Sequence, residues 1–196
     1  MSGIERHVLM LRHPQTVANA EGRFIGHCDS PRTPCGEAQV LEMARVVAEW
    51  QPEVIYSSPL TRARAAAREI APPGVEVVVL DGLAEIDFGE LQGLTWEEAS
   101  ERGILPDYSG KGPVAPGGEN TADFAARVSA AGSVITSGPR RSAVVAHGGV
   151  ARELCAEWLR IPLDAAWRIG MRHGSALGFK IGSGWAVLEL LRPLEA

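Results

Sequence analysis

Two arginines, two histidines and one glutamate stand in the sequence where they could act together on a phosphate group. Arg12 and His13 directly follow the apolar run HVLML, and His147 ends the run SAVVAH. Arg62 and Glu85 each come shortly after a further apolar run. Guanidinium groups suit bidentate contact with phosphoryl oxygens, and a neutral imidazole can attack phosphorus. A carboxylic acid can protonate a leaving oxygen and then activate water, so these residue types fit chemistry on a phosphomonoester.

The elements that must position these residues alternate along the chain as strands and helices. Strands are predicted at 7–11, 53–58, 75–80 and 142–147, helices at 36–50, 59–71, 95–103, 119–137 and 149–160, and a closing hairpin at 175–181 and 185–191. This alternation predicts an α/β fold, a three-layer α/β/α sandwich with a largely parallel central sheet. We expect one domain over 1–196, in which the Gly- and Pro-rich segment 81–118 forms a lid-like insert.

The predicted strands end at one edge of the sheet, and the candidate catalytic residues lie at these strand ends. Ligands of such sheets bind beyond the carboxyl ends of the strands. His147 leads into Gly148 at a predicted helix start, where free N–H groups and the helix dipole favour an anion. Any one of these residues alone would be an ordinary structural or surface residue. Their coordinated placement at strand ends is what predicts a site.

Composition excludes several other classes of function. A net charge of -5 argues against a nucleic-acid binder, which would need a basic face. No stretch approaches 18 uncharged apolar residues, and Glu5, Arg6 and His7 make the N-terminus a poor secretory signal. Three cysteines without CxxC spacing are typical of reduced thiols. We therefore expect a cytoplasmic protein with no membrane or nucleic-acid partner.

Five stretches, in order, resemble the motifs of the histidine phosphatase superfamily, also called phosphoglycerate mutase-like. They cover about residues 7 to 155. The stretches are LRHPQTVAN, RFIGHCDSPRTPCGEAQ, SSPLTRA, LAEIDFGELQGLTWEE, and the pair PGGEN and VVAHGGVAR. The first alone is a weak signal, whereas the ordered set is specific. The wording EIDFGELQG is similar to the α-ribazole phosphatase-like branch.

The resemblance implies a role for each matching position. His13 would be the nucleophile that becomes phosphohistidine, and Glu85 the proton donor. The phosphoryl oxygens would be clamped by Arg12, Arg62 and His147. Accessory phosphate or substrate contacts would come from Asn19, Arg23, Thr16 and the Gly148 backbone. The resemblance implies no metal and no organic cofactor, and the expected partner is a small phosphorylated substrate. The oligomeric state stays open, with a homodimer as one option.

Departures from the family pattern bear on activity. Pro14 replaces a glycine, so any backbone N–H donation there is lost and substrate approach could change. Glu85 and His147 are only 62 positions apart, a short span that favours a phosphatase over a mutase. Inside the insert, five apolar residues could face the substrate alcohol, although packing against the core is the favoured interpretation. They are Phe88, Leu91, Trp96, Leu105 and Tyr108.

Three other functions stay open. A mutase would move the phosphoryl group between positions of one substrate. A non-catalytic phosphate binder would not need both a nucleophile and an acid, yet His13 and Glu85 are both present. A metallophosphatase is the weakest rival, because the histidines with Asp29 and Glu85 form no local metal-ligand motif. The favoured hypothesis is a metal-independent phosphomonoesterase.

Overall fold

A six-stranded sheet runs through the centre of the molecule. The computed structural model describes residues 5–109 and 111–192, so residue 110 and both ends of the predicted domain lie outside the described residues. The strands are β1 (Arg6–Arg12), β2 (Val54–Ser57), β3 (Glu76–Val79), β4 (Arg141–Ala146), β5 (Ala176–Gly182) and β6 (Trp185–Arg192), in the order β3-β2-β4-β1-β5-β6. The first four are mutually parallel, and β5 pairs antiparallel with both β1 and β6. The predicted largely parallel sheet and closing hairpin are both confirmed.

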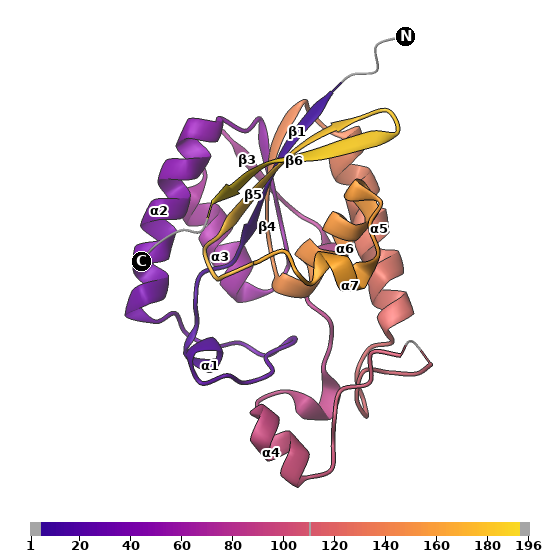
Figure 1. The fold of residues 1–196 in the computed structure, drawn as a ribbon. Helices are drawn as coiled ribbons and strands as arrows, with labels where there is room; N and C mark the ends of the chain where they lie inside the picture. Colours follow the sequence, from indigo (N-terminus) through magenta and orange to yellow (C-terminus); the bar gives the residue numbers. More distant parts are fainter. Residues whose placement is uncertain (1–4, 110, 193–196) are drawn as a thin grey trace.

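Helices cover both faces of this sheet and complete the predicted three layers (Figure 1). One face carries α2 (Pro34–Trp50) and α3 (Thr61–Ile70), and the other carries α5 (Thr121–Ser137) and α6 (Gly148–Leu159). Shorter pieces are α1 (Val17–Ala20), α4 (Trp96–Glu101), α7 (Leu163–Ala166) and the 3₁₀ turns η1 (Asp81–Leu83) and η2 (Gly89–Leu91). Among the described residues, no helix combines the length and the apolar character that crossing a membrane requires.

The strand β1 shows why the sheet has helices on both sides. Its side chains alternate between the two faces, as strand geometry requires. Val8 and Met10 belong to the core under α5 and α6, whereas Leu9 and Leu11 belong to the core under α2 and α3. All four are fully buried. A strand buried on both faces reads as a continuous apolar run, which is how the sequence revealed it.

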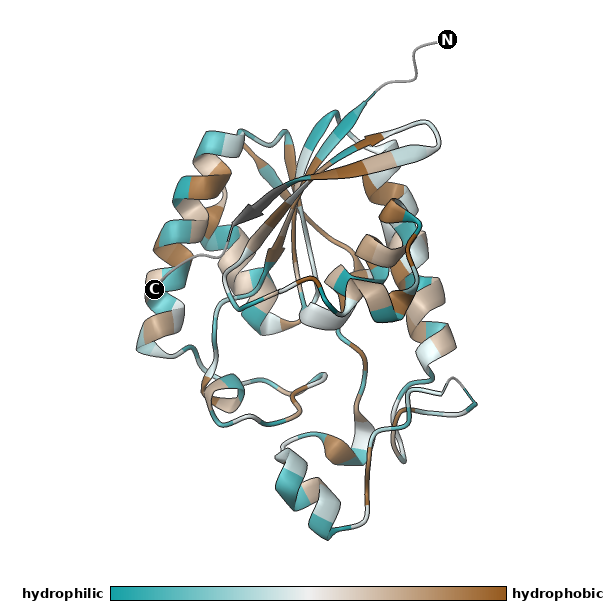
Figure 2. Ribbon diagram, in the orientation of Figure 1, coloured by the Kyte–Doolittle hydropathy of each residue, from teal (hydrophilic) through white to brown (hydrophobic). Residues whose placement is uncertain are grey.

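Local sequence signals set the ends and the faces of the helices. At the start of α2, the Thr33 side chain accepts the Gly36 N–H (3.0 Å) and Pro34 occupies the first position. The hydropathy bands along α2 in Figure 2 reflect its one buried side. Gly132 in α5 has a packing role, because a Cβ there would lie 2.7 Å from Leu154 of α6. The glycine therefore allows these two helices to approach closely.

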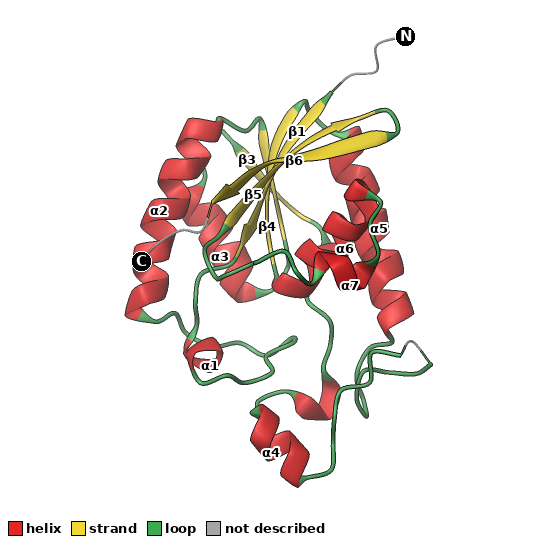
Figure 3. Cartoon of the chain, viewed as in Figure 1, coloured by secondary structure: helices red, strands yellow, loops and turns green. Residues whose placement is uncertain are grey.

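The insert lies beyond the carboxyl ends of the parallel strands and is largely loop (Figure 3). It has a small hydrophobic core, made of Leu91, Leu94, Ala99 and Ala115 with partly buried Phe88 and Ile104, and Phe24 from the loop after α1 packs against it. The helix α4 is fixed by a capping box, in which Thr95 and Glu98 each bond the other's backbone N–H. The insert, with this core and capped helix, lies next to the edge of the sheet where the candidate catalytic residues gather.

Candidate active site

His13 stands directly after β1 with its ring held in one orientation. The side chain is 3% exposed, and Nδ1 lies 2.8 Å from the Pro14 carbonyl oxygen. A carbonyl can only accept, so Nδ1 carries the ring proton and Nε2 keeps its lone pair. Arg62 Nε–H donates to that Nε2 at 3.3 Å, which agrees with this tautomer. The ring therefore presents a neutral, nucleophilic nitrogen.

Pro14 supplies a carbonyl at this point, and its missing N–H costs the His13 contact nothing. The family glycine and the proline found here have the same backbone oxygen, which is the atom that His13 uses. Proline fixes its own φ, and this suits a residue that must hold one orientation. The replacement of the family glycine by Pro14 therefore leaves the orientation of the His13 ring intact.

Two arginines flank His13 and are anchored by backbone carbonyls. Arg62, in the first turn of α3, donates to the carbonyls of Cys28 (3.0 Å) and Gly26 (2.7 Å). Arg12 donates to the Met171 carbonyl at 2.6 Å. Burial lowers the pKa of Arg62, and burial likewise lowers the pKa of Arg12 to about 10. Both still carry a positive charge near neutral pH, so they offer two fixed cations to an anion.

His147 occupies the N-cap position of α6, directly after β4, and its side chain makes no capping hydrogen bond. Its ring centre lies 5.1 Å from that of His13, and its Nε2 lies 2.7 Å from Ser58 Oγ. Ser58 Oγ also accepts the Leu60 N–H, so the hydroxyl proton can be given to His147. The Nδ1 atom of His147 is buried without a partner among the described residues, which leaves a donor for a phosphoryl oxygen. The sequence did not predict a role for Ser58, although Ser58 lies in the SSPLTRA stretch.

The carboxylate of Glu85 is held by backbone N–H groups. Oε2 accepts from Gly149 N and Oε1 from Ile86 N, each at 3.0 Å. A Cβ on Gly149 would collide with Glu85 Oε1, so only glycine lets the two approach. Each carboxylate oxygen keeps a second lone pair, which is where a transferable proton would sit.

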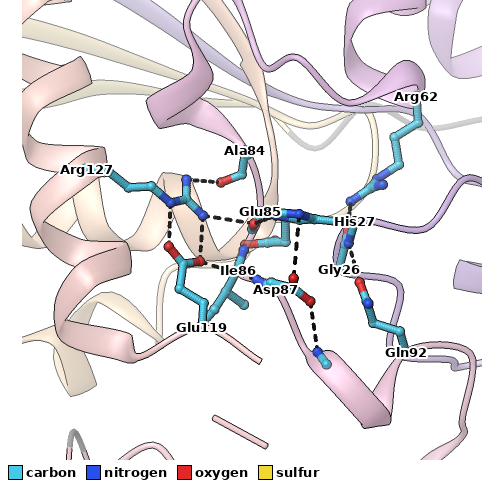
Figure 4. A network of polar contacts seen from close by, with 11 residues as sticks. Gly26, His27, Arg62, Ala84, Glu85, Ile86, Asp87, Gln92, Glu119 and Arg127 are labelled. Carbon is cyan, nitrogen blue, oxygen red and sulfur yellow. Dashed lines mark hydrogen bonds and ion pairs between the residues drawn. The ribbon is translucent and has the colours of Figure 1, made fainter. Parts of the chain in front are cut away.

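A partly buried ion pair fixes the segment that carries Glu85, as Figure 4 shows. Arg127 of α5 donates to the carbonyls of Gly82 (3.1 Å), Ala84 (2.7 Å) and Glu85 (3.0 Å). Glu119 binds the same guanidinium through both oxygens, at 2.7 and 2.8 Å. Glu119 lies in the PGGEN stretch, so this motif could have indicated that Glu119 supports the site. No motif pointed to Arg127.

The remaining sequence-predicted residues are divided between the cavity and its supports. Asn19, Arg23 and Gly148 line the cavity, whereas Thr16 is fully buried and donates its hydroxyl to Asn19 Oδ1 at 2.8 Å. Thr16 thus positions Asn19. Arg23 pairs with Glu21 (2.7 Å) and with Glu98 of α4 (2.8 Å), so it ties the insert to the α1 loop.

The cavity itself measures about 730 Å³ and brings His13, Arg12, Arg62 and Glu85 together. Of the five insert residues considered for the substrate surface, only Phe88 and Tyr108 line it. Leu91 is fully buried in the core of the insert, and Trp96 and Leu105 are about half exposed outside the cavity. Further aromatic surface comes from elements without an expected role, namely Phe24, Phe124 and Trp167.

Two buried histidines, His13 and His147, and the partly buried His173 should make the protein less stable in mild acid. Burial, with the charge of Arg62, lowers the pKa of His13 and of His147 well below 6.5, and burial lowers the pKa of His173 to about 3. The folded protein keeps these rings neutral, whereas the unfolded chain protonates them below about pH 6.5. Unfolding then takes up protons, so the free energy of unfolding falls as the pH falls.

Urea denaturation at pH 7.5, 6.5 and 5.5 measures this effect. We expect the dependence on pH to correspond to an uptake of roughly two to three protons at the acid end. His173→Asn should remove one of these protons, and His7→Asn at the far end of β1 is the matched control. Equal slopes for His173→Asn and the parent protein would contradict the assignment.

Known proteins resemble this chain over most of its length. Glucosyl-3-phosphoglycerate phosphatase of Mycobacterium tuberculosis is 32% identical over 195 residues, which cover 92% of this chain and 87% of the relative. A probable phosphoglycerate mutase of Shigella boydii is 32% identical over 194 residues, covering 92% and 90%. The solved α-ribazole phosphatase of Shigella flexneri shares the fold, with a TM-score of 0.84, 22% identity, and coverage of 94% and 95%.

The family model described as histidine phosphatase superfamily (branch 1) matches residues 8–192. This span contains every residue of the site described above. It also contains all the helices and strands except the first two residues of β1, Arg6 and His7. The family expected from the ordered motifs is therefore confirmed by the match, and the fold expected from the strand–helix alternation is confirmed by the sheet. The chain belongs to the histidine phosphatase superfamily.

Proposed function

We propose that this chain is a metal-independent phosphomonoesterase that acts through a phosphohistidine on His13. The observation that carries the proposal is the His13 ring, with its proton on Nδ1 and its lone pair on Nε2 beside Arg62. Glu85 lines the same cavity as that nitrogen. The family and its phosphatase members make the chain a phosphoric monoester hydrolase. The substrate is a small phosphorylated metabolite.

In the first step, His13 Nε2 attacks phosphorus and the bond to the ester oxygen breaks. Glu85, in its acid form, gives its proton to that leaving oxygen. Arg12, Arg62 and the free nitrogen of His147 bind the phosphoryl oxygens, whose charge shifts as the group is transferred. The Nδ1 proton of His13 stays hydrogen-bonded to the Pro14 carbonyl, so positive charge on the ring is stabilised by that oxygen. The products of this step are the alcohol and phosphohistidine.

In the second step, water attacks the phosphorus of phosphohistidine. The Glu85 carboxylate, left by the first step, takes a proton from that water. The P–N bond breaks, Nε2 regains its lone pair, and inorganic phosphate leaves. The backbone contacts of Glu85 need not change between the two steps, because Gly149 and Ile86 donate to the oxygens in either form.

Hydrolysis of 4-nitrophenyl phosphate in excess EDTA tests this proposal. We expect release of inorganic phosphate at the same rate with and without EDTA. Loss of turnover in EDTA and its recovery with a divalent metal would instead support a metallophosphatase. The mutase alternative, which the Shigella boydii relative keeps open, requires 2-phosphoglycerate to form from 3-phosphoglycerate faster than phosphate is released. A protein that binds phosphate and turns over neither compound would support the binder.

A further inference from the structure

A third arginine lies beside the two that flank His13. Arg152 stands one turn after Gly148 in α6, so its side chain lies over the same face and reaches back toward the helix start. A Cβ built on Gly148 would lie 3.0 Å from Arg152 Nη1 and 3.3 Å from Arg12 Cζ. The two guanidinium groups therefore approach each other across the side-chain-free surface of Gly148, and both line the cavity.

Arg152 lies over an aromatic ring, and no protein carboxylate pairs with it among the described residues. Its guanidinium carbon lies 4.1 Å from the centre of the Trp167 ring. Among the described residues no acidic side chain comes within salt-bridge distance of it, and its Nε is buried without a hydrogen-bond partner. The adjacent Glu153 also lines the cavity, but neighbouring helix residues do not face each other. Burial and Glu157 raise the pKa of Glu153, and no arginine offsets this.

Once a phosphoryl group is bound in the cavity, Arg152 remains without a counter-charge. A phosphomonoester dianion is balanced by Arg12 and Arg62. Glu85 is the carboxylate that stabilises the charge of Arg152 at longer range, and it is neutral when it carries the proton for the leaving oxygen. A half-buried cation would then lack a counter-charge, which is costly. A substrate with one more negative group would supply it.

The walls beyond Arg152 are aromatic. Tyr108 of the insert meets Trp167 with ring centres 6.3 Å apart, and both are about half exposed. On another side, Phe24 and Phe88 lie 5.3 Å apart, and Phe124 completes this surface. A cavity of about 730 Å³ is far larger than a phosphoryl group requires, so most of it is available to the alcohol part.

We propose that Arg152 binds a carboxylate on the substrate alcohol, close to the ester oxygen, while the aromatic walls take an apolar or aromatic side group. The substrate class is then a phosphorylated hydroxy acid with such a side group. This inference rests on the proposed phosphatase function and adds to it a binding residue and a ligand chemistry. The carboxylate must lie near the ester because Arg152 and Arg12 approach the same point beside Gly148.

Binding to a protein that cannot turn over separates this inference from the catalytic one. His13→Ala keeps the three arginines, and its affinity for the phosphate ester of phenyllactate is compared with that for the primary amide of the same ester. Calorimetry should show the acid binding roughly 10- to 100-fold more tightly, because the amide cannot form a charge-assisted bidentate contact. The phosphate ester of lactate, which lacks the phenyl group, should bind more weakly than the phenyllactate ester.

Variants in the same background assign the preference to Arg152. Arg152→Gln should reduce the acid-over-amide ratio to below roughly threefold. Arg152→Lys keeps the charge but loses the guanidinium group over Trp167, so it should retain part of the ratio. It also provides the test if the glutamine variant fails to fold. Arg168→Gln is the matched control, because Arg168 is an exposed arginine next to Trp167 that does not line the cavity. Its ratio should stay at the parent value.

Two results would overturn the inference while the phosphatase proposal stands. Equal affinity for acid and amide would show that no carboxylate subsite exists. An equal loss of affinity for both compounds in Arg152→Gln would make Arg152 a further phosphoryl ligand. Conversely, wild-type protein that binds the acid selectively and yet hydrolyses no phosphomonoester would support the subsite and contradict the catalytic proposal.

Discussion

Replacing His13 with alanine is expected to lower kcat for phosphomonoester hydrolysis by roughly 10⁴-fold or more, because no covalent phosphoryl intermediate can then form. The ring is the buried group whose unprotonated Nε2 faces Arg62, and no other imidazole of the site has this arrangement among the described residues. Arg12, Arg62 and His147 remain in the variant, so KM should change much less than kcat. Initial rates with 4-nitrophenyl phosphate measure both constants.

The matched control is His7→Ala, at the opposite end of the same strand. It should keep the wild-type rate. A second readout is the intermediate itself: wild-type protein mixed with ³²P-labelled substrate and quenched in alkali should retain a label that acid removes. The assignment would be wrong if His13→Ala protein retained the same acid-labile label.

Glu85→Gln is expected to slow hydrolysis of an alkyl phosphate by roughly 10²–10⁴-fold, the usual share of general acid–base catalysis. Glutamine has no proton to give to the leaving oxygen and cannot accept one from water. The first step should be nearly unaffected for 4-nitrophenyl phosphate, whose leaving group needs little protonation. The second step should still be slow, so we expect a burst of nitrophenolate equal to the enzyme concentration.

Glu90→Gln, on the exposed surface of the same insert, is the control for the change of charge and should be fully active. Thermal melting checks the fold, since the new amide group faces the backbone N–H of Gly149 or Ile86 and some loss of stability is expected. A Glu85→Gln protein that hydrolyses alkyl phosphates at the wild-type rate would remove Glu85 from the acid role.

Apolar runs made the sheet predictable. A strand buried on both faces, such as β1, leaves a continuous signal in the sequence, and chemical residues at the ends of such strands must share an edge. This is why the amino-acid sequence alone could place Arg12, His13 and His147 together. The placement of Glu85 was less direct, because it lies within the weakly patterned segment 81–118, and the motif around it added to the indication given by the preceding apolar run.

Contacts made by backbone atoms could not be predicted from the sequence. The orientation of His13 comes from the carbonyl of Pro14, an atom that every residue type has, so no residue identity could reveal it. Arg127 bonds three carbonyls from a distant helix, and one arginine on a helix face looks like any other. The helices α1 and α7 have four residues each, too few for a periodic pattern.

The grip of Arg127 on the Glu85 segment has a consequence for how this protein can diverge. The guanidinium bonds main-chain oxygens, so its contact with the Glu85 segment does not itself depend on the side chains of the residues that it contacts. Its partner Glu119 directly follows the insert. The ion pair therefore connects the two ends of the insert. The loop between them is then free to accept substitutions that alter which alcohol is recognised. We therefore expect substitutions in this loop to change the preferred alcohol without removing the proposed acid role of Glu85.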